Sequence, residues 1–217
     1  MTTSIPRLKL LKHDQYRGVN DNDPLRYYYW PLVGHMYRRR VELCLAECKG
    51  GKRVLEVGFG TGLSFLNLHE MYDEIFGLDL TVNIDEVSSV FNQLGIRTNL
   101  QNGNVIQMPY EANTFDTVLL ISILEHLQPV EQDAAFQEIR RVLKPNGQAV
   151  YGVPVERPFM VSVFHLLGYD IRKEHFSTEK QVAAAAEKYL SKERIVEMQS
   201  FPPLFGTVYE IGHFLKK

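Results

Sequence analysis

Three glycines at alternating positions follow an apolar stretch in the segment VLEVGFGTG. They are Gly58, Gly60 and Gly62, and a helical pattern begins directly after them at Leu63. Glycine lets the backbone pass close to a ligand, and the start of a helix presents free N–H groups. Glu56, two residues before the first glycine, adds a carboxylate suited to a cationic or N–H-rich ligand rather than to a pyrophosphate.

The spacing of these glycines differs from that of a dinucleotide-binding loop, which follows the pattern Gly-x-Gly-x-x-Gly. Counting from Gly58 places Leu63 where the third glycine should stand, and counting from Gly60 places Phe65 there. A nicotinamide-dependent oxidoreductase is therefore a disfavoured alternative, and a test of NAD binding would decide it.

A second carboxylate ends the next apolar stretch, IFGLDL, where Asp79 is followed by Leu80. The two oxygens of an aspartate can accept both hydroxyl protons of a ribose. Taken alone, Asp79 would be interpreted as a cap of the following helix. Its position after the glycine loop favours the ligand role instead.

Together these motifs resemble those of the class I, Rossmann-like methyltransferases that use S-adenosylmethionine, of the small-molecule type. The resemblance covers about residues 50–154 and is weaker beyond them. It implies that residues 56–62, including Phe59, wrap the methionine part of the cofactor, and that Asp79 and Leu80 lie at the ribose. It also implies S-adenosylhomocysteine as the product and no metal.

Two further segments extend the resemblance. In the loop after the third predicted strand, Asn104 stands where the family usually has an aspartate, and Val105 follows it. The Asn104 carbonyl can still accept a hydrogen bond from the adenine amino group. Ile121 and Ser122, at the end of the fourth strand, are expected near the methionine moiety, because ligands of open parallel sheets lie beyond the carboxyl ends of the strands.

Methyl transfer from a sulfonium is an in-line displacement with an activated leaving group, so a catalytic base is optional. If the acceptor has to lose a proton, His126 and His175 are the two candidates for the base. For both histidines we favour the interpretation that they take no part in the chemistry; for His126 the resemblance implies a place near the floor of the site.

The acceptor would be chosen by segments outside the cofactor motifs. Tyr27, Tyr29 and Trp30 lie where this family often carries a lid, and they could line the acceptor pocket or surround the sulfonium; packing on the sheet is the alternative. The arginines at 38–40 are typical of a solvated face, with binding of an acidic substrate group as the minority interpretation. The apolar segment at about 155–178 would roof an apolar pocket or touch a membrane.

These side chains need a scaffold that brings the ends of successive strands together. Short apolar runs alternate with helix-length amphipathic stretches, which predicts an α/β, Rossmann-like, doubly wound sheet. We expect seven mostly parallel strands with an antiparallel C-terminal strand, and helices on both faces. Strands are predicted at 53–58, 74–80, 97–103, 116–122, 147–154, 193–201 and 207–215. Helices are predicted at 40–48, 62–72, 84–94, 131–143 and 177–190, the last capped by Ser177.

Length and composition bound the class of protein. A chain of 217 residues fits one domain, and a formal net charge of -2 makes nucleic acid an unlikely partner. The resemblance implies a methyltransferase domain at 50–217 preceded by a helical lid at 1–49. Cys44 and Cys48, four residues apart, predict two reduced thiols on one helix face. The N-terminus has no apolar core of signal-peptide length and no apolar run is long enough to span a bilayer, so we expect a cytoplasmic protein without a transmembrane segment, as a monomer or a homodimer.

A methyltransferase of a small-molecule acceptor, with an apolar or lipid-linked acceptor included, is the main hypothesis. The alternatives are a non-catalytic scaffold that binds S-adenosylmethionine and a methyltransferase of a macromolecular acceptor. The intact loop and Asp79 favour the enzyme, because a scaffold has no need to keep both.

Overall fold

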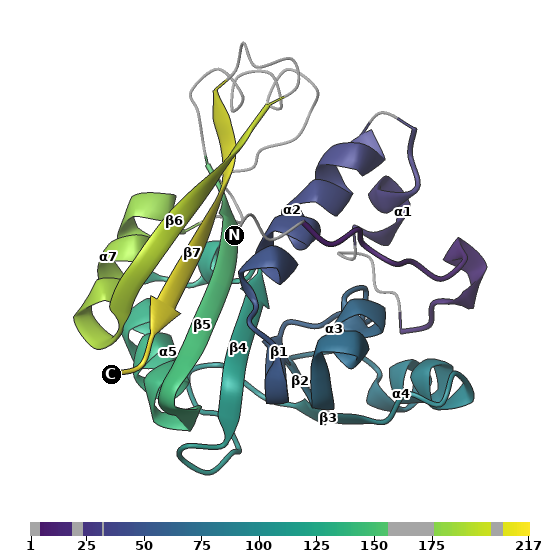
Figure 1. The fold of residues 1–217 in the computed structure, drawn as a ribbon, viewed down its shortest axis with the longest axis horizontal. Coiled ribbons are helices and arrows are strands. Elements are labelled where there is room, and N and C mark those ends of the chain that lie inside the picture. Colours follow the sequence, from purple (N-terminus) through teal and green to yellow (C-terminus); the bar gives the residue numbers. More distant parts are fainter. Residues whose placement is uncertain (1–4, 19–23, 32, 156–175, 201–205) are drawn as a thin grey trace.

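The computed structural model describes residues 5–18, 24–31, 33–155, 176–200 and 206–217 (Figure 1). Its seven-stranded sheet has the strand order β3-β2-β1-β4-β5-β7-β6. Strands β1 to β5 run parallel, and β7 runs antiparallel to both β5 and β6. The predicted Rossmann-like sheet with an antiparallel C-terminal strand is thus confirmed.

The strands are β1 (Gly51–Val57), β2 (Tyr72–Asp79), β3 (Thr98–Asn102), β4 (Phe115–Ile121), β5 (Leu143–Pro154), β6 (Ser191–Gln199) and β7 (Thr207–Leu215). The α-helices are α1 (Leu25–Tyr28), α2 (Val33–Glu47), α3 (Phe65–Met71), α4 (Ile84–Gln93), α5 (Pro129–Val142) and α7 (Glu179–Tyr189). Two short 3-10 helices are η1 (His13–Gln15) and η2 (Leu124–His126). The predicted strands and helices all occur, with shifts at their ends.

Three elements begin differently from the prediction. Helix α3 begins at Phe65 rather than at Gly62, because Gly62 has a φ of 74°, outside the right-handed helical region. Strand β5 begins at Leu143 rather than at Gly147, with a register shift against β4. The predicted cap of helix α7 was wrong: Thr178 accepts from the Gln181 amide, whereas the Ser177 hydroxyl donates to the Leu127 carbonyl.

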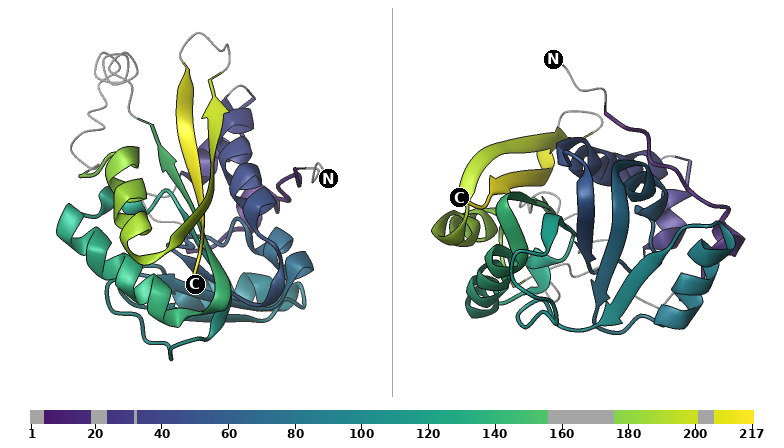
Figure 2. Two further views of the ribbon diagram at one scale, coloured as in Figure 1. Left: turned by 60° about the vertical axis from the view of Figure 1, so that its left-hand side comes forward. Right: turned by 60° about the horizontal axis from the view of Figure 1, so that its bottom comes forward.

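The alternation of side chains along the strands divides the core into two layers. In β4, Leu119 belongs to the layer that contains residues of α2, α3 and α4, whereas Val118 and Leu120 belong to the layer that contains residues of α5 and α7. The two further views show the sheet between these helices (Figure 2). Because both faces are covered, the parallel strands are apolar on both sides, as the sequence pattern predicts.

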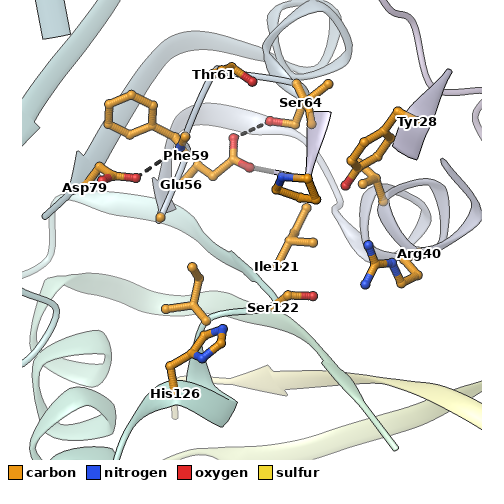
Figure 3. Close-up of a pocket in the computed structure, with 16 residues that line it drawn as sticks. Tyr28, Arg40, Glu56, Phe59, Thr61, Ser64, Asp79, Ile121, Ser122 and His126 are labelled. Carbon is orange, nitrogen blue, oxygen red and sulfur yellow. Dashed lines mark hydrogen bonds between the residues drawn. The ribbon is translucent and has the colours of Figure 1, made fainter. Parts of the chain in front are cut away.

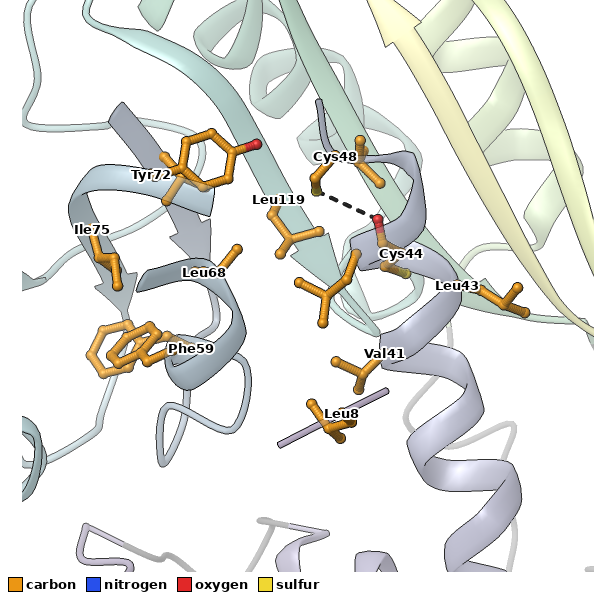
Figure 4. Close-up of a cluster of buried hydrophobic side chains, with 14 of the residues drawn as sticks. Leu8, Val41, Leu43, Cys44, Cys48, Phe59, Leu68, Tyr72, Ile75 and Leu119 are labelled. Carbon is orange, nitrogen blue, oxygen red and sulfur yellow. Dashed lines mark hydrogen bonds between the residues drawn. The ribbon is translucent and has the colours of Figure 1, made fainter. Parts of the chain in front are cut away.

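Helix α2 is held on the sheet by a buried cluster that includes both cysteines (Figure 4). Cys44 and Cys48 are free thiols and both are buried, which confirms the predicted reduced pair. The Cys48 thiol lies 3.4 Å from the carbonyl oxygen of Cys44, the usual backbone contact of a buried helical cysteine. Burial raises the pKa of the Cys48 thiol to about 12, so this thiol is inert at neutral pH.

An ion-pair network joins the end of α2 to the C-terminal strands. The buried carboxylate of Glu47 accepts from Nε and Nη2 of Arg194 at 2.5 and 2.7 Å. It also lies 3.2 Å from Nδ1 of His213, which is buried on β7. The network ties the helix to β6 and β7 and so fixes one wall of the site described below.

The division into a lid at 1–49 and a domain at 50–217 stays a prediction. Most of the predicted insertion at 155–178, together with His175, lies outside the described residues. In the described part of the chain, no helix is long and apolar enough to cross a membrane.

Candidate active site

A pocket of about 280 Å³ opens where β1, β2 and β4 end (Figure 3). Parallel strands meet at the same edge of the sheet at their carboxyl ends, so residues from distant parts of the chain converge there. The pocket is lined by Pro24, Tyr28, Arg40, Val41, Glu56, Gly58, Phe59, Gly60, Thr61, Leu63, Ser64, Asp79, Ile121, Ser122, Ile123 and His126.

The glycine loop needs glycine for its backbone conformation. Gly58, Gly60 and Gly62 have φ values of 69°, 51° and 74°, which other residues rarely adopt. The loop is closed by hydrogen bonds from the Gly58 amide to the Leu78 carbonyl at 2.7 Å and from the Gly62 amide to the Phe59 carbonyl at 2.8 Å. A bare backbone curve therefore faces the pocket.

Replacing Gly62 with alanine is expected to destabilise the protein by about 2 to 4 kcal/mol, the sum of backbone strain and overpacking. A β-carbon there would lie 2.6 Å from Cε2 of Phe91 and 2.7 Å from Cδ2 of Phe65. Urea denaturation measures the loss.

Gly95→Ala is the matched control, because Gly95 has nearly the same φ of 75° and nothing within 4 Å of its would-be β-carbon. It reports the strain alone and should cost about 1 kcal/mol. Equal losses in the two variants would show that the packing around Gly62 is loose.

Asp79 lies against this loop and points toward it. Its Oδ2 accepts from the Gly60 amide at 3.1 Å, and its Oδ1 accepts from the amides of Thr81 and Val82 at 3.1 and 3.3 Å. A carboxylate offers about four acceptor positions. Backbone amides use three of these positions, so about one is left for a ribose hydroxyl. The sequence predicted that Asp79 accepts from both ribose hydroxyls, which would need two.

Glu56 places a buried carboxyl group beneath the loop, with an exposed fraction of 5%. It accepts a short hydrogen bond from the Ser64 hydroxyl. The pKa of Glu56 is raised to about 8: burial raises it most, the Ser64 hydrogen bond lowers it in part, and the charge of Asp79 raises it. At neutral pH this carboxyl is therefore largely protonated, and a cation beside it would favour its ionised form.

The exit of β4 forms the opposite wall. Ser122 has a φ of 56°, and its amide donates to the Gly152 carbonyl at 2.8 Å. Its hydroxyl is hydrogen bonded to the hydroxyl of Tyr209 at 2.8 Å. His126, on η2, lies on the same side of the pocket (Figure 3).

The structure brings most of the predicted cofactor residues together, although which of them bind a ligand stays a prediction. Glu56, Gly58, Phe59, Gly60, Asp79, Ile121 and Ser122 all line the pocket. Four others do not line it: Gly62 closes the loop, Leu80 is 66% exposed, the Asn104 side chain accepts from the Ile106 amide, and Val105 is buried.

The predicted acceptor residues lie around the pocket rather than in its lining. Tyr29 donates to the Leu11 carbonyl at 2.6 Å, and the rings of Tyr27 and Trp30 pack edge to face, 5.2 Å apart. Their neighbour Tyr28 lines the pocket instead. Of the two candidate bases, His126 lines the pocket and His175 is outside the described residues.

Several lining residues escaped the sequence analysis. Thr61 and Ser64 could have been found from the sequence, because Thr61 stands between Gly60 and Gly62 and Ser64 follows Gly62 by two residues. Val41 had no signal of its own, whereas Arg40 belongs to the arginines at 38–40, for which binding of an acidic substrate group is the minority interpretation of the sequence. Among the described side chains, no cluster of three or more His, Cys, Asp or Glu residues could hold a metal ion.

Comparison with known proteins agrees with this geometry. Residues 55–151 match the family described as "Methyltransferase domain". An uncharacterized methyltransferase, YcgJ of Bacillus subtilis, is 32% identical over 105 residues, 48% of this chain and 41% of the relative. Demethylmenaquinone methyltransferase of Shouchella clausii is 29% identical over 143 residues, 64% of this chain and 60% of the relative.

Among solved structures, the geranyl diphosphate C-methyltransferase of Streptomyces coelicolor has the same fold, with a TM-score of 0.70 at 13% identity over 93% of this chain and 91% of that chain. The matched part of the present chain spans less than half the length of the first curated relatives. The sheet order and the glycine loop define a class I, Rossmann-like methyltransferase domain. Residues 55–151 belong to the methyltransferase-domain family.

Proposed function

We propose that this protein transfers a methyl group from S-adenosylmethionine to a small-molecule acceptor. The observation that carries the proposal is the hydrogen bond from the Gly60 amide to Asp79, which holds an acidic side chain beside a bare backbone curve. When bound, S-adenosylmethionine supplies a methyl group on an already activated sulfur leaving group. The protein then has to bind the cofactor and the acceptor, orient them for transfer and exclude water.

The chain's own groups fit this cofactor. Asp79 has acceptor capacity left for a ribose hydroxyl, and Glu56 offers a carboxylate to the positively charged methionine end. The Thr61 hydroxyl lines the pocket, is buried and has no hydrogen-bond partner in the described structure. An unsatisfied buried hydroxyl is costly, so a polar ligand group such as a carboxylate would be a natural partner.

The kind of acceptor is inferred from the pocket and from the names of relatives. Curated relatives include demethylmenaquinone and sterol methyltransferases, and both names point to small apolar acceptors. Val41, Ile121 and Ile123 line the present pocket with apolar side chains, which suits such a molecule. If the acceptor must lose a proton, His126 is the candidate base within the pocket.

The test follows a labelled methyl group. Purified protein is incubated with methyl-labelled S-adenosylmethionine and, in separate reactions, with the low-molecular-mass and the macromolecular fractions of a cell extract, and the label is followed into products. We expect label in small molecules, and far less of it with the Asp79→Ala variant at a concentration of S-adenosylmethionine that does not saturate this variant. Binding without transfer to any fraction would favour the non-catalytic scaffold, and label in protein or nucleic acid would contradict the acceptor class.

The raised pKa of Glu56, about 8, predicts pH-dependent cofactor binding. Below this pKa the carboxyl is protonated and neutral, and above it the carboxylate can face a cation. Relative to a variant that cannot ionise at this position, affinity for S-adenosylmethionine should therefore rise about tenfold between pH 7 and pH 9, because about one Glu56 carboxyl in ten is ionised at pH 7.

Glu56→Gln is the matched variant for this prediction, since its amide cannot ionise. The amino group of the ligand titrates near pH 8, and the variant reports that contribution alone. Calorimetric titrations at each pH should show the ratio of wild-type to variant affinity rising with pH. A ratio that stays constant would mean that Glu56 does not ionise on binding.

A further inference from the structure

Arg40 of helix α2 lines the pocket, yet its guanidinium makes no hydrogen bond or ion pair with any described residue. Its Nε is buried and without a partner. The two preceding arginines differ: Arg38 donates to the Tyr28 carbonyl at 2.8 Å, and Arg39 lies 3.7 Å from the Glu42 carboxylate. Of the three arginines, only Arg40 lines the pocket, and its charge is influenced by the buried carboxylate of Glu125 without a hydrogen bond between them.

Aromatic rings hold this charge in place. The Arg40 guanidinium carbon lies 4.0 Å from the ring centroid of Tyr37 and 5.3 Å from that of Tyr209. Ring contacts engage the flat face of a guanidinium and leave its N–H edge available. Burial lowers the pKa of Arg40, but Tyr28, Tyr209, Tyr37 and Glu125 together keep it above its ordinary value, so the group stays charged.

The position of Arg40 separates it from the nucleoside end of the site. In Figure 3, Asp79 and the glycine loop lie at one side of the pocket, and Arg40 lies at the other, close to Tyr28 and Ser122. Tyr209, which contacts Arg40, is also hydrogen bonded to Ser122 at the exit of β4. The guanidinium thus lies beside the end of β4, on the side of the pocket opposite to Asp79.

We propose that Arg40 binds an anionic group of the acceptor, a carboxylate or a phosphate, and so selects acceptors with an apolar body and an acidic head. A guanidinium matches the two oxygens of such a group, and desolvating a cation is costly unless an anion meets it. Val41, the next residue of the helix, also lines the pocket and would contact the apolar body. This inference rests on the proposed function, because it names the acceptor of the same site.

The test uses three probes with the same chain length: octanoate, octyl phosphate and octan-1-ol. Each is titrated calorimetrically into the wild type and into Arg40→Met, with and without saturating S-adenosylhomocysteine. We expect at least one anionic probe to bind the wild type tenfold or more tightly than the alcohol. The preference should vanish in Arg40→Met and persist in part in Arg40→Lys; a carboxylate head and a phosphate head are distinguished by which anion binds better.

Arg39→Met is the matched control, because it removes the same charge from the neighbouring position, which does not line the pocket. It should keep the full preference for the anion, and circular dichroism checks that each variant folds. Equal binding of anion and alcohol by the wild type, or no binding of either anion, would overturn the proposal. So would a tenfold loss of S-adenosylhomocysteine affinity in Arg40→Met, since the charge would then serve the cofactor's carboxylate.

The proposed function can fail separately from this inference. Absence of S-adenosylhomocysteine binding by the wild type would end the methyltransferase proposal. The titrations without S-adenosylhomocysteine would still show whether Arg40 selects an anion.

Discussion

Asp79→Ala is expected to lower the affinity for S-adenosylmethionine about 100-fold, or about 2.7 kcal/mol. Two losses combine in this variant. A charge-assisted hydrogen bond to a ribose hydroxyl contributes about 1.5 to 3 kcal/mol. In addition, the Gly60 amide loses the carboxylate that holds it at 3.1 Å, so the loop is less well fixed before the ligand arrives. Calorimetric titration measures the change.

Two variants sharpen this prediction. Asp79→Asn keeps one acceptor oxygen but loses the charge, and we expect a loss of about tenfold. Asp85→Ala removes an exposed carboxylate from the first turn of α4, outside the pocket, and should leave the affinity within about twofold of the wild type. If Asp79→Ala folds and binds as well as Asp85→Ala, the ribose role of Asp79 is wrong.

Glu47→Ala is expected to destabilise the protein by about 3 kcal/mol. Glu47 is buried, and it pairs with Arg194 through two hydrogen bonds and with His213 through a third. Removing one partner of a buried pair leaves the other charge uncompensated, which typically costs about 3 to 5 kcal/mol. Arg194 is half exposed, so we expect the lower end. For a chain of this size, Tm should fall by about 6 to 12 °C.

Glu187→Ala provides the comparison for this stability prediction. Glu187 pairs with Lys192 at 2.9 Å, with both side chains about half exposed. Exposed pairs contribute about 0 to 1 kcal/mol, so the Tm of this variant should hardly change. Similar small losses in Glu187→Ala and Glu47→Ala would show that the network at the end of α2 does not anchor this helix.

The fold and the cofactor end of the site were accessible from sequence because their signals are local. Alternating glycines demand a backbone conformation that other residues resist, and Gly58, Gly60 and Gly62 all have positive φ values. An apolar strand that ends in Asp79 then fixes where the carboxylate must lie, since parallel strands end at a common edge. Few other arrangements satisfy both constraints.

The acceptor end was less accessible because it depends on which way neighbouring side chains point. Successive helical residues are turned by about 100° from one another. Three consecutive arginines therefore meet three environments, and only Arg40 faces the pocket. The same holds in the aromatic block, where Tyr28 lines the pocket between two tyrosines that do not. The residue types alone do not tell which side of a helix faces the pocket.

The central claim is that a nucleoside lies between the glycine loop and Asp79. A crystal structure of the protein with S-adenosylhomocysteine tests it most directly. We expect a ribose hydroxyl within about 3.2 Å of an Asp79 oxygen, the normal limit for such a hydrogen bond, and the amino acid end of the ligand near Glu56 and Thr61. A ligand bound elsewhere, or one whose ribose makes no contact with Asp79, would contradict the assignment.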